Sequence, residues 1–494
     1  MTGGNPDGDE SASTAPQRRR RSDPTDPAGG REPAAGTSAG PSTGPTPGVG
    51  RGGAGSAEPS AAPAASAGPA SPAARSLLLR GALLADGRRV DVRLAGPRIE
   101  AVGTAGSLPA HDPAEILDLR GYLLLPAPAE PHSHLDTALA GPGAGAECAA
   151  VQRRVVEGAL TALGYGATAQ RTHVRIGDVH GMARLEAALT AGQVLSGLLE
   201  LQIVAMPRVL TGLAGADGRA RLRDAVKAGA WAIGGCPELD PDPAGFVEEL
   251  LCVAGEFGCA VDLHTDGSDP VRLARTAAAL GPLRPRVALG PLGRLALPAE
   301  PAAGGAGGMG GGARTGLGAG GNAGAERLAA AGVSVVCLPQ NGTCSGEPAA
   351  RPTPRTPRVA RALREAGVLV AAGSGGLRDA ANPVGRADPL EAVFLLASSG
   401  AFTPAEAYEA VSARARALMG LPEVRVDAGF AAELLAVRGD TLEAALTSGH
   451  SRVVVHRGRV VSRTSAVREF AEAEPLPDGA AGPSPVPRQG NGGH

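Results

Sequence analysis

Residues 131–136 read Pro-His-Ser-His-Leu-Asp and place two histidines two positions apart. The apolar run 122–125 and a proline-rich segment precede this stretch. Because side chains at positions i and i+2 of a β-strand point to the same face, His132 and His134 can reach one metal ion from one strand. Neutral imidazole is a good ligand for zinc and iron. A His-x-His pair alone has little specificity, so its meaning depends on the rest of the chain.

Strand-like and helix-like segments alternate after the histidine pair. The segments that we interpret as strands are 130–134, 168–174, 201–206, 231–235, 259–264, 286–290, 333–338 and 368–373. Strands that alternate with helices predict parallel βαβ units, and a (β/α)8 barrel needs eight such strands. We therefore predict an α/β fold with a TIM barrel of this type over residues 128–423.

A second domain is predicted from both ends of this region. Short apolar runs separated by glycine and aspartate turns fill residues 77–102, and residues 91–94 alternate as a half-buried strand does. A similar pattern returns between residues 432 and 462. We predict a small composite β domain built from residues 76–127 together with residues 424–465.

Three segments have the composition of linkers or disordered chain. Residues 1–75 and 472–494 are rich in Pro, Ala, Gly and Ser, and they lack the apolar residues that offset the entropy of ordering. Residues 302–324 are mostly glycine and alanine and are interpreted as an insert in the barrel. A phosphate-binding loop is the alternative for this insert, but it lacks the Lys-Ser/Thr ending of such loops.

Composition limits the classes of partner. The chain of 494 residues has a net charge of −2, which gives no attraction to nucleic acid or to a membrane surface. It contains no apolar run near the roughly 18 residues that a transmembrane helix needs. Its six cysteines include no Cys-x-x-Cys pair, so we expect reduced thiols rather than a zinc ribbon. We predict a cytoplasmic protein.

Four predicted strands carry motifs of a known family. Their sequences are Glu-Pro-His-Ser-His-Leu-Asp-Thr at 130–137, Arg-Thr-His-Val at 171–174, Leu-Gln-Ile-Val-Ala-Met-Pro at 201–207 and Val-Asp-Leu-His at 261–264. With the predicted barrel and β domain, these motifs resemble the amidohydrolase superfamily and, within it, the cytosine-deaminase branch. The resemblance implies a hydrolase that cleaves a non-peptide C–N bond in a cyclic amidine, with a small heterocycle as substrate.

The resemblance also implies a metal site. One divalent ion, zinc or iron, is expected on His132, His134 and the strand-five His264, together with an aspartate on strand eight. In the family, a glutamate three residues after the strand-five histidine shuttles protons, and a histidine on strand six positions the attacking water. The metal acidifies this water for attack on the C–NH2 carbon.

Several of these family positions carry other residues in this chain. The proton-shuttle position is Gly267, the strand-six histidine falls at Gly290 or Pro291, and the strand-eight aspartate falls at Gly375. The substrate-reading glutamine after strand three falls at Arg208. Three histidines and an open position can still hold zinc. General acid–base catalysis typically raises a reaction rate by about 10²- to 10⁴-fold. The residues that provide it in the family are absent from these positions.

Two aspartates are candidates for this acid–base function. Asp266 is one position from the shuttle, so in an extended chain its side chain would face away. Asp379 follows the strand-eight position by a few residues and reaches the site only if its loop folds back. Arg208 is a candidate for binding a substrate carboxylate, although a solvated arginine is an equal interpretation in this arginine-rich chain. His173 is interpreted as a structural histidine beside the ligands, like its family counterpart.

Two functional hypotheses stay open. The first is an active but divergent metal-dependent hydrolase of the deaminase type. The second is a catalytically inactive relative, a pseudoenzyme that binds a small molecule or a protein partner. Because the family's aspartate and glutamate are absent, the residues alone favour the second hypothesis for the chemistry, while the ancestry is hydrolytic. Related enzymes often oligomerise, so a homo-oligomer is a further expectation.

Overall fold

A computed structural model describes residues 76–110, 114–141, 145, 147–283, 287–297, 323–340, 356–467 and 469. The segments predicted to be disordered, 1–75 and 472–494, lie outside the described residues, as do residues 302–322 of the predicted insert. The last two residues of that insert instead begin a helix, α6 (Ala323–Ala331). This alanine-rich run forms a helix because it can bury Leu328 in the apolar core.

The first of two sheets contains parallel strands that neighbour one another in sequence order. They are β6 (Ala129–Ser133), β7 (Ala169–Arg175), β8 (Glu200–Met206), β9 (Ala232–Gly235), β10 (Ala260–Thr265), β11 (Val287–Pro291), β12 (Ser334–Cys337) and β13 (Val370–Ala372). An isolated parallel bridge between Ser133 and Gly375 joins β6 to the segment after β13. These strands form a nearly closed barrel, which confirms the predicted α/β TIM-barrel fold.

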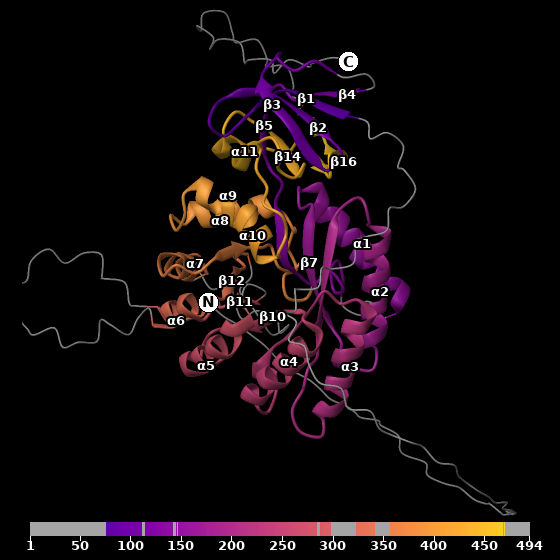
Figure 1. The fold of residues 1–494 in the computed structure, drawn as a ribbon, viewed down its shortest axis with the longest axis vertical. Helices are drawn as coiled ribbons and strands as arrows, with labels where there is room; N and C mark the ends of the chain where they lie inside the picture. The colour runs from indigo at the N-terminus through magenta and orange to yellow at the C-terminus, as the bar shows by residue number, and fades with distance from the viewer. Residues whose placement is uncertain are drawn as a thin grey trace, which may run out of the picture. The chain divides into compact units, whose positions relative to one another are not determined.

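Helices connect the barrel strands and pack around them (Figure 1). Besides α6 they are α1 (Cys148–Gly164), α2 (Gly181–Val194), α3 (Gly215–Ala228), α4 (Pro243–Phe257), α5 (Pro270–Leu280), α7 (Thr356–Glu365), α8 (Pro389–Ser398), α9 (Pro404–Val411) and α10 (Ala413–Leu418). Helix α5 begins where the sequence indicates, because the Asp269 side chain accepts hydrogen bonds from the N–H groups of Val271 and Arg272. Among the described residues, no helix is long and apolar enough to cross a membrane.

The barrel strands separate an apolar outer face from a polar inner face. On β10, Val261 and Leu263 belong to the apolar core that the strands share with the helices. The alternate residues Asp262 and His264 point into the barrel, where Asp262 meets Arg171 of β7. This period of two therefore places polar side chains inside the barrel.

The second sheet has the strand order β16-β15-β14-β5-β1-β2-β3, with β4 paired to β1. Its strands are β1 (Ser76–Leu83), β2 (Arg89–Ala95), β3 (Arg98–Thr104), β4 (Ala114–Asp118), β5 (Tyr122–Pro126), β14 (Leu434–Arg438), β15 (Arg452–His456) and β16 (Arg459–Thr464). Strand β5 pairs antiparallel with β14, so that Leu125 lies opposite Leu435. The expectation of one β domain drawn from both ends of the ordered chain is confirmed.

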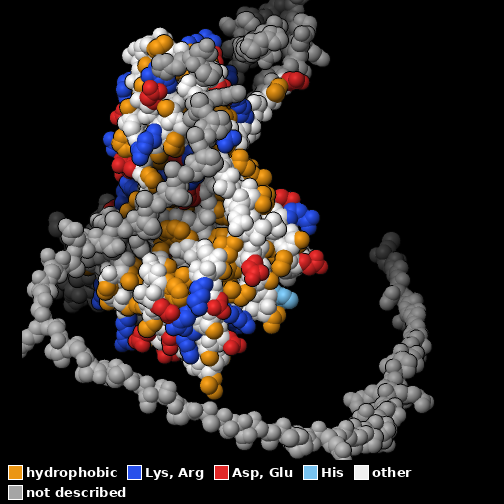
Figure 2. Space-filling view, turned by 45° about the vertical axis from the view of Figure 1, so that its right-hand side comes forward, with side chains coloured by type: hydrophobic (Ala, Val, Ile, Leu, Met, Phe, Trp, Pro, Cys, Tyr) orange, Lys and Arg blue, Asp and Glu red, His pale blue; other side chains and the backbone are white. Residues whose placement is uncertain are grey.

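The surface carries charges of both signs. On the face shown in Figure 2, Lys and Arg side chains are interspersed with Asp and Glu side chains over the described residues. The whole chain has a net charge of −2. Positive and negative side chains are thus mixed on this face of the molecule.

A buried polar network joins the second sheet to α10. The Glu433 carboxylate accepts a hydrogen bond from the Arg457 N–H at 3.1 Å, and it lies 2.9 Å from His456 Nδ1 and 3.4 Å from Arg416 Nη2. Burial alone would raise the pKa of Glu433. The hydrogen bond with His456 and the charge of Arg416 outweigh burial and hold this pKa below its ordinary value.

Glu433→Gln should therefore destabilise the protein in a pH-dependent way. A carboxyl whose pKa is lower in the folded state stabilises the fold above its unfolded pKa, and this contribution disappears as the pH falls through the folded pKa. We expect a loss of about 1–3 kcal/mol in the free energy of unfolding near neutral pH. The difference in Tm between wild type and variant, measured by circular dichroism, should be large at about pH 6 and small at about pH 3.

The exposed Glu423 provides the matched control, because its side chain pairs only at the surface with Arg425. Glu423→Gln should leave Tm nearly unchanged at both pH values. A destabilisation by Glu433→Gln that is equal at both pH values would contradict the assignment of an ionised carboxylate to this network.

Candidate metal centre

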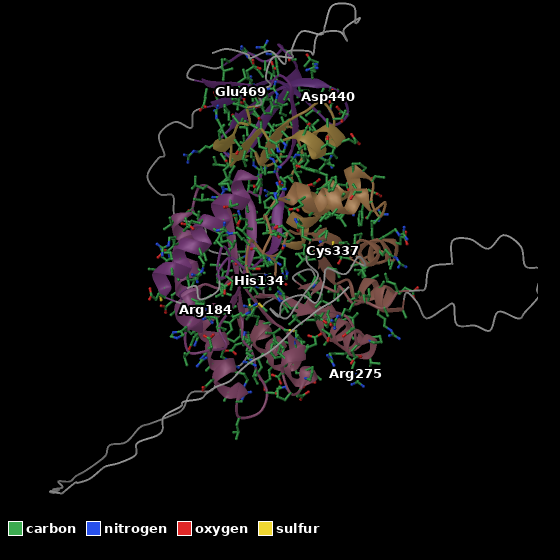
Figure 3. All side chains as sticks on the ribbon, turned by 180° about the vertical axis from the view of Figure 1, so that it is seen from behind. His134, Arg184, Arg275, Cys337, Asp440 and Glu469 are labelled. Carbon is green, nitrogen blue, oxygen red and sulfur yellow. The ribbon has the colours of Figure 1, made fainter. Side chains whose placement is uncertain are left out.

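Four histidines meet at the carboxyl ends of the barrel strands. His132 lies in β6, His134 directly follows that strand, His173 lies in β7 and His264 lies in β10. One ring nitrogen of each histidine lies within 4.8 Å of one ring nitrogen of every other. Figure 3 shows His134 among the barrel strands. The structure thus brings together the three histidines expected as ligands and adds His173 to the group.

The four rings are closely packed. The ring centroid of His132 lies 4.5 Å from that of His264 and 4.4 Å from that of His173. The ring centroid of His134 lies 5.3 Å from that of His264. Burial first, and then the neighbouring histidines, hold the pKa values of His132 and His134 well below the ordinary value. Both imidazoles are therefore neutral near pH 7, which is the form that binds a metal.

These residues fit a divalent metal ion. The Nδ1 atom of His134 is buried and has no hydrogen-bond partner among the described residues. A buried polar atom without a partner costs about 1–3 kcal/mol, and a metal ion would provide the missing partner. Three imidazoles with room for a further ligand are also the donor set of one class of zinc site.

His173 is held differently from the other three histidines. Its Nδ1 atom lies 3.2 Å from the Ser133 carbonyl oxygen. Its Nε2 atom lies 3.3 Å from Asp262 Oδ1. Because an oxygen faces each ring nitrogen, these contacts favour a supporting role for His173 over a role as a metal ligand.

A buried ion pair that the sequence analysis did not single out lies next to His173. Arg171 Nη1 is 2.8 Å from Asp262 Oδ2, and both side chains are 2% exposed. Gln202 Oε1 accepts a hydrogen bond from Arg171 Nε at 3.1 Å. Burial alone would raise the pKa of Asp262, but His173 and Arg171 outweigh it and hold the pKa below its ordinary value. Spacing along the chain could have predicted that both side chains line the site, because Arg171 and Asp262 each stand two residues before a histidine of the group.

Glu130 connects the first barrel strand, β6, with the segment that follows the last barrel strand, β13. Its carboxylate accepts hydrogen bonds from the His132 N–H at 3.1 Å and the Ser374 N–H at 2.8 Å, and from the Ser374 hydroxyl. Burial raises the pKa of Glu130 to about 7. Since Ser374 lies two residues after the end of β13, this carboxylate helps to hold β6 beside that segment.

The structure places the two expected aspartates at the same end of the barrel. Asp266 Oδ1 accepts a hydrogen bond from the Ser268 N–H at 2.9 Å, within the turn after β10. Asp379 accepts hydrogen bonds from the N–H groups of Ala381 and Asn382. Its Oδ2 also accepts a hydrogen bond from the Thr137 hydroxyl at 3.3 Å. The loop after β13 therefore folds back to the segment that follows His134.

Arg208, the expected substrate-binding arginine, follows β8 and is exposed. It thus lies at the carboxyl end of a barrel strand, where the loops of TIM barrels form their sites. An exposed guanidinium here is open to a ligand and to water alike.

Glycine stands at three positions where the sequence resemblance led us to expect a functional side chain, and other atoms lie close to each of them. Gly267 and Gly375 have φ angles of +71° and +75°, which favour glycine. A Cβ atom at Gly267 would lie 3.0 Å from Leu292 Cδ2, and one at Gly375 would lie 3.3 Å from Leu338 Cδ1. At Gly290, a Cβ atom would lie 2.5 Å from a backbone oxygen of β12. A backbone oxygen therefore blocks a side chain at Gly290, while leucine side chains would have to shift to admit one at Gly267 or Gly375.

No family model and no curated protein sequence matches this chain. Solved structures do match it. The N-isopropylammelide isopropylaminohydrolase of Burkholderia multivorans is 27% identical, with a TM-score of 0.63, over 79% of this chain and 99% of its own. The 5-methylcytosine deaminase of Klebsiella pneumoniae with bound phosphonocytosine is 19% identical, with a TM-score of 0.63, over 80% of this chain and 100% of its own.

A variant of a triazine hydrolase also matches, at 17% identity and a TM-score of 0.56, over 79% of this chain and 95% of its own. The likeness to the deaminase and to the triazine hydrolase shows a shared fold. The aminohydrolase shares this fold at the highest of the three identities.

Proposed function

We propose that this chain is a metal-dependent hydrolase of the cytosine-deaminase type, which cleaves a non-peptide C–N bond in a small nitrogen heterocycle. The observation that carries the proposal is the group of four histidines at the carboxyl ends of β6, β7 and β10. In TIM-barrel enzymes this end of the barrel holds the active site. The deaminase and hydrolase neighbours support the same reaction class.

In this proposal His132, His134 and His264 hold one divalent ion, zinc or iron. The ion, when bound, acidifies water and draws electrons from the carbon under attack. His173 keeps the neighbouring rings in place through its contacts with Ser133 and Asp262. Arg208 is proposed to bind an acidic group of the substrate.

The other parts of the proposal concern partners and location. We propose a small heterocycle as the ligand, no nucleic-acid or membrane partner, a cytoplasmic location and a homo-oligomer. The net charge of −2 and the mixed charges on the face shown in Figure 2 support the absence of a nucleic-acid or membrane partner. The family resemblance alone supports the oligomer.

A catalytically inactive, ligand-binding relative is the second candidate. The observation that favours it is the leucine packing at Gly267 and Gly375, where Leu292 and Leu338 stand close to the backbone. In this candidate the site has lost its acid–base groups and binds a heterocycle without turning it over. Both candidates share the fold and the histidines, so only turnover separates them.

The separating experiment is a substrate screen. The protein, reconstituted with zinc or with iron, is incubated with cytosine, isoguanine and aminotriazines, and the release of ammonia or amine is measured. The hydrolase proposal predicts turnover of at least one compound, and its loss in His264→Ala. The exposed His450 provides the control, because His450→Ala should retain the activity. Metal-loaded protein that releases no amine from any compound would favour the inactive relative.

A further inference from the structure

A carboxylate that the sequence analysis did not single out contacts Thr265, the residue that follows His264. Glu238 belongs to a short 3-10 helix, η1 (Pro237–Leu239), which directly follows β9. Strand β9 pairs in parallel with β10, and Gly235 lies opposite Leu263. This register brings the segment after β9 alongside His264, the last histidine of the group.

The first oxygen of Glu238 is linked to the position of the family's proton shuttle. Thr265 directly follows His264, and its hydroxyl donates a hydrogen bond to Glu238 Oε1 at 2.5 Å. The same hydroxyl accepts a hydrogen bond from the Gly267 N–H at 3.3 Å. A single hydroxyl group therefore connects the Glu238 carboxylate to residue 267, where this chain has no side chain of its own.

The second oxygen of Glu238 faces a thiol. Cys236 Sγ donates a hydrogen bond to Glu238 Oε2 at 3.3 Å. Burial, and then the neighbouring Glu238 carboxylate, raise the pKa of Cys236 to about 12. The thiol therefore stays protonated and acts as a donor to Glu238.

The partners of Glu238 suit proton transfer better than those of the two aspartates. Asp266 accepts a hydrogen bond from a backbone N–H group, and Asp379 accepts two such bonds beside a longer one, of 3.3 Å, from the Thr137 hydroxyl. A backbone N–H group cannot turn away or accept a proton in return. Glu238 is held instead by the hydroxyl of Thr265 and the thiol of Cys236. A hydroxyl can rotate from donor to acceptor, so a protonated Glu238 can donate back to Thr265.

We infer that Glu238 is the proton-transfer group of this site and takes the place of the glutamate that the family carries at the position of Gly267. The inference rests on the proposed hydrolase function. In the reaction, the Glu238 carboxylate takes a proton from water as the water oxygen bonds to the ring carbon. The protonated Glu238 then gives this proton to the leaving nitrogen as the C–N bond breaks. In total, water and the aminoheterocycle are converted into the ring carbonyl compound and ammonia or an amine.

The kinetic test compares variants at constant metal content. Glu238→Gln should lower kcat by roughly 10²- to 10⁴-fold. Glu238→Asp should retain part of the activity, because it keeps the carboxylate. All variants should bind as much metal as the wild type. Glu249→Gln on α4 is the control with unchanged activity, since this glutamate pairs only with Arg219 at the surface.

A second test needs no substrate and no metal. In chelator-treated protein, the rate of alkylation of Cys236 by iodoacetamide is followed by mass spectrometry. Removal of the neighbouring negative charge in Glu238→Gln should lower the pKa of Cys236, and each unit of decrease gives about tenfold more thiolate and faster labelling. Glu249→Gln should label at the wild-type rate.

The outcomes distinguish this inference from the proposed function. If the wild type is active and Glu238→Gln is equally active, the assignment of Glu238 is wrong while the proposed function stands. The same conclusion follows if Asp266→Asn, and not Glu238→Gln, shows the large loss of kcat. Unchanged labelling of Cys236 in Glu238→Gln would overturn the geometry on which the assignment rests, whatever the activity. Metal-loaded wild type without turnover would overturn the proposed function and this inference with it.

Discussion

Replacing His132 with alanine is expected to remove a near-stoichiometric divalent metal from the purified protein. His132 is 1% exposed and its ring lies 4.5 Å from that of His264, so it belongs to the buried group that would hold the ion. Loss of a residue that only supports a ligand typically costs about 10- to 100-fold in metal affinity. Loss of a ligand should cost more. Metal content by mass spectrometry, after reconstitution with zinc or iron, measures the effect.

Two further histidine variants make this experiment specific. His173→Ala should lower the affinity by only about 10- to 100-fold, because His173 is held by Ser133 and Asp262 and acts through its neighbours. His180→Ala, at an exposed position before α2, should bind metal as the wild type does. Wild-type protein that takes up neither zinc nor iron would contradict the metal site, and the search would turn to ligands and partners.

The barrel and three of its histidines could be predicted because they follow local patterns. Alternation within β10 separates His264 from the apolar residues that face the helices. Spacing of two within one strand sets His132 and His134 on one side. Such patterns need only neighbouring residues, and they are strong where a strand is buried on one face and lines a site on the other.

The acid–base groups were harder to predict because they depend on loops. The distance along the chain from His264 pointed to Asp266, yet the carboxylate that contacts Thr265 is Glu238, on the segment after the neighbouring strand. Whether Asp379 reaches the site depends on the path of its loop, and a loop has no periodic sequence pattern from which its path could be predicted. The leucine that packs against Gly267 likewise comes from another strand end.

Asp262→Ala should be among the most destabilising substitutions in the barrel. Arg171 is 2% exposed, and in this variant its guanidinium would keep Gln202 and the face of Trp231 but lose its ionic partner, Asp262. Breaking a buried pair from one side typically costs about 3–5 kcal/mol, because the remaining charge is left uncompensated. Urea unfolding in the presence of a chelator measures this loss without any contribution from bound metal.

The double variant Arg171→Met/Asp262→Leu separates the cost of an unpaired charge from the value of the pair itself. Apolar replacement of both partners of a buried pair is often neutral or stabilising, so this variant should recover most of the stability that Asp262→Ala loses. Glu256→Ala, which breaks the exposed pair with Arg223, should cost less than about 1 kcal/mol. If the double variant were as unstable as Asp262→Ala, the lost stability would come from packing around His173 and not from the buried charge of Arg171.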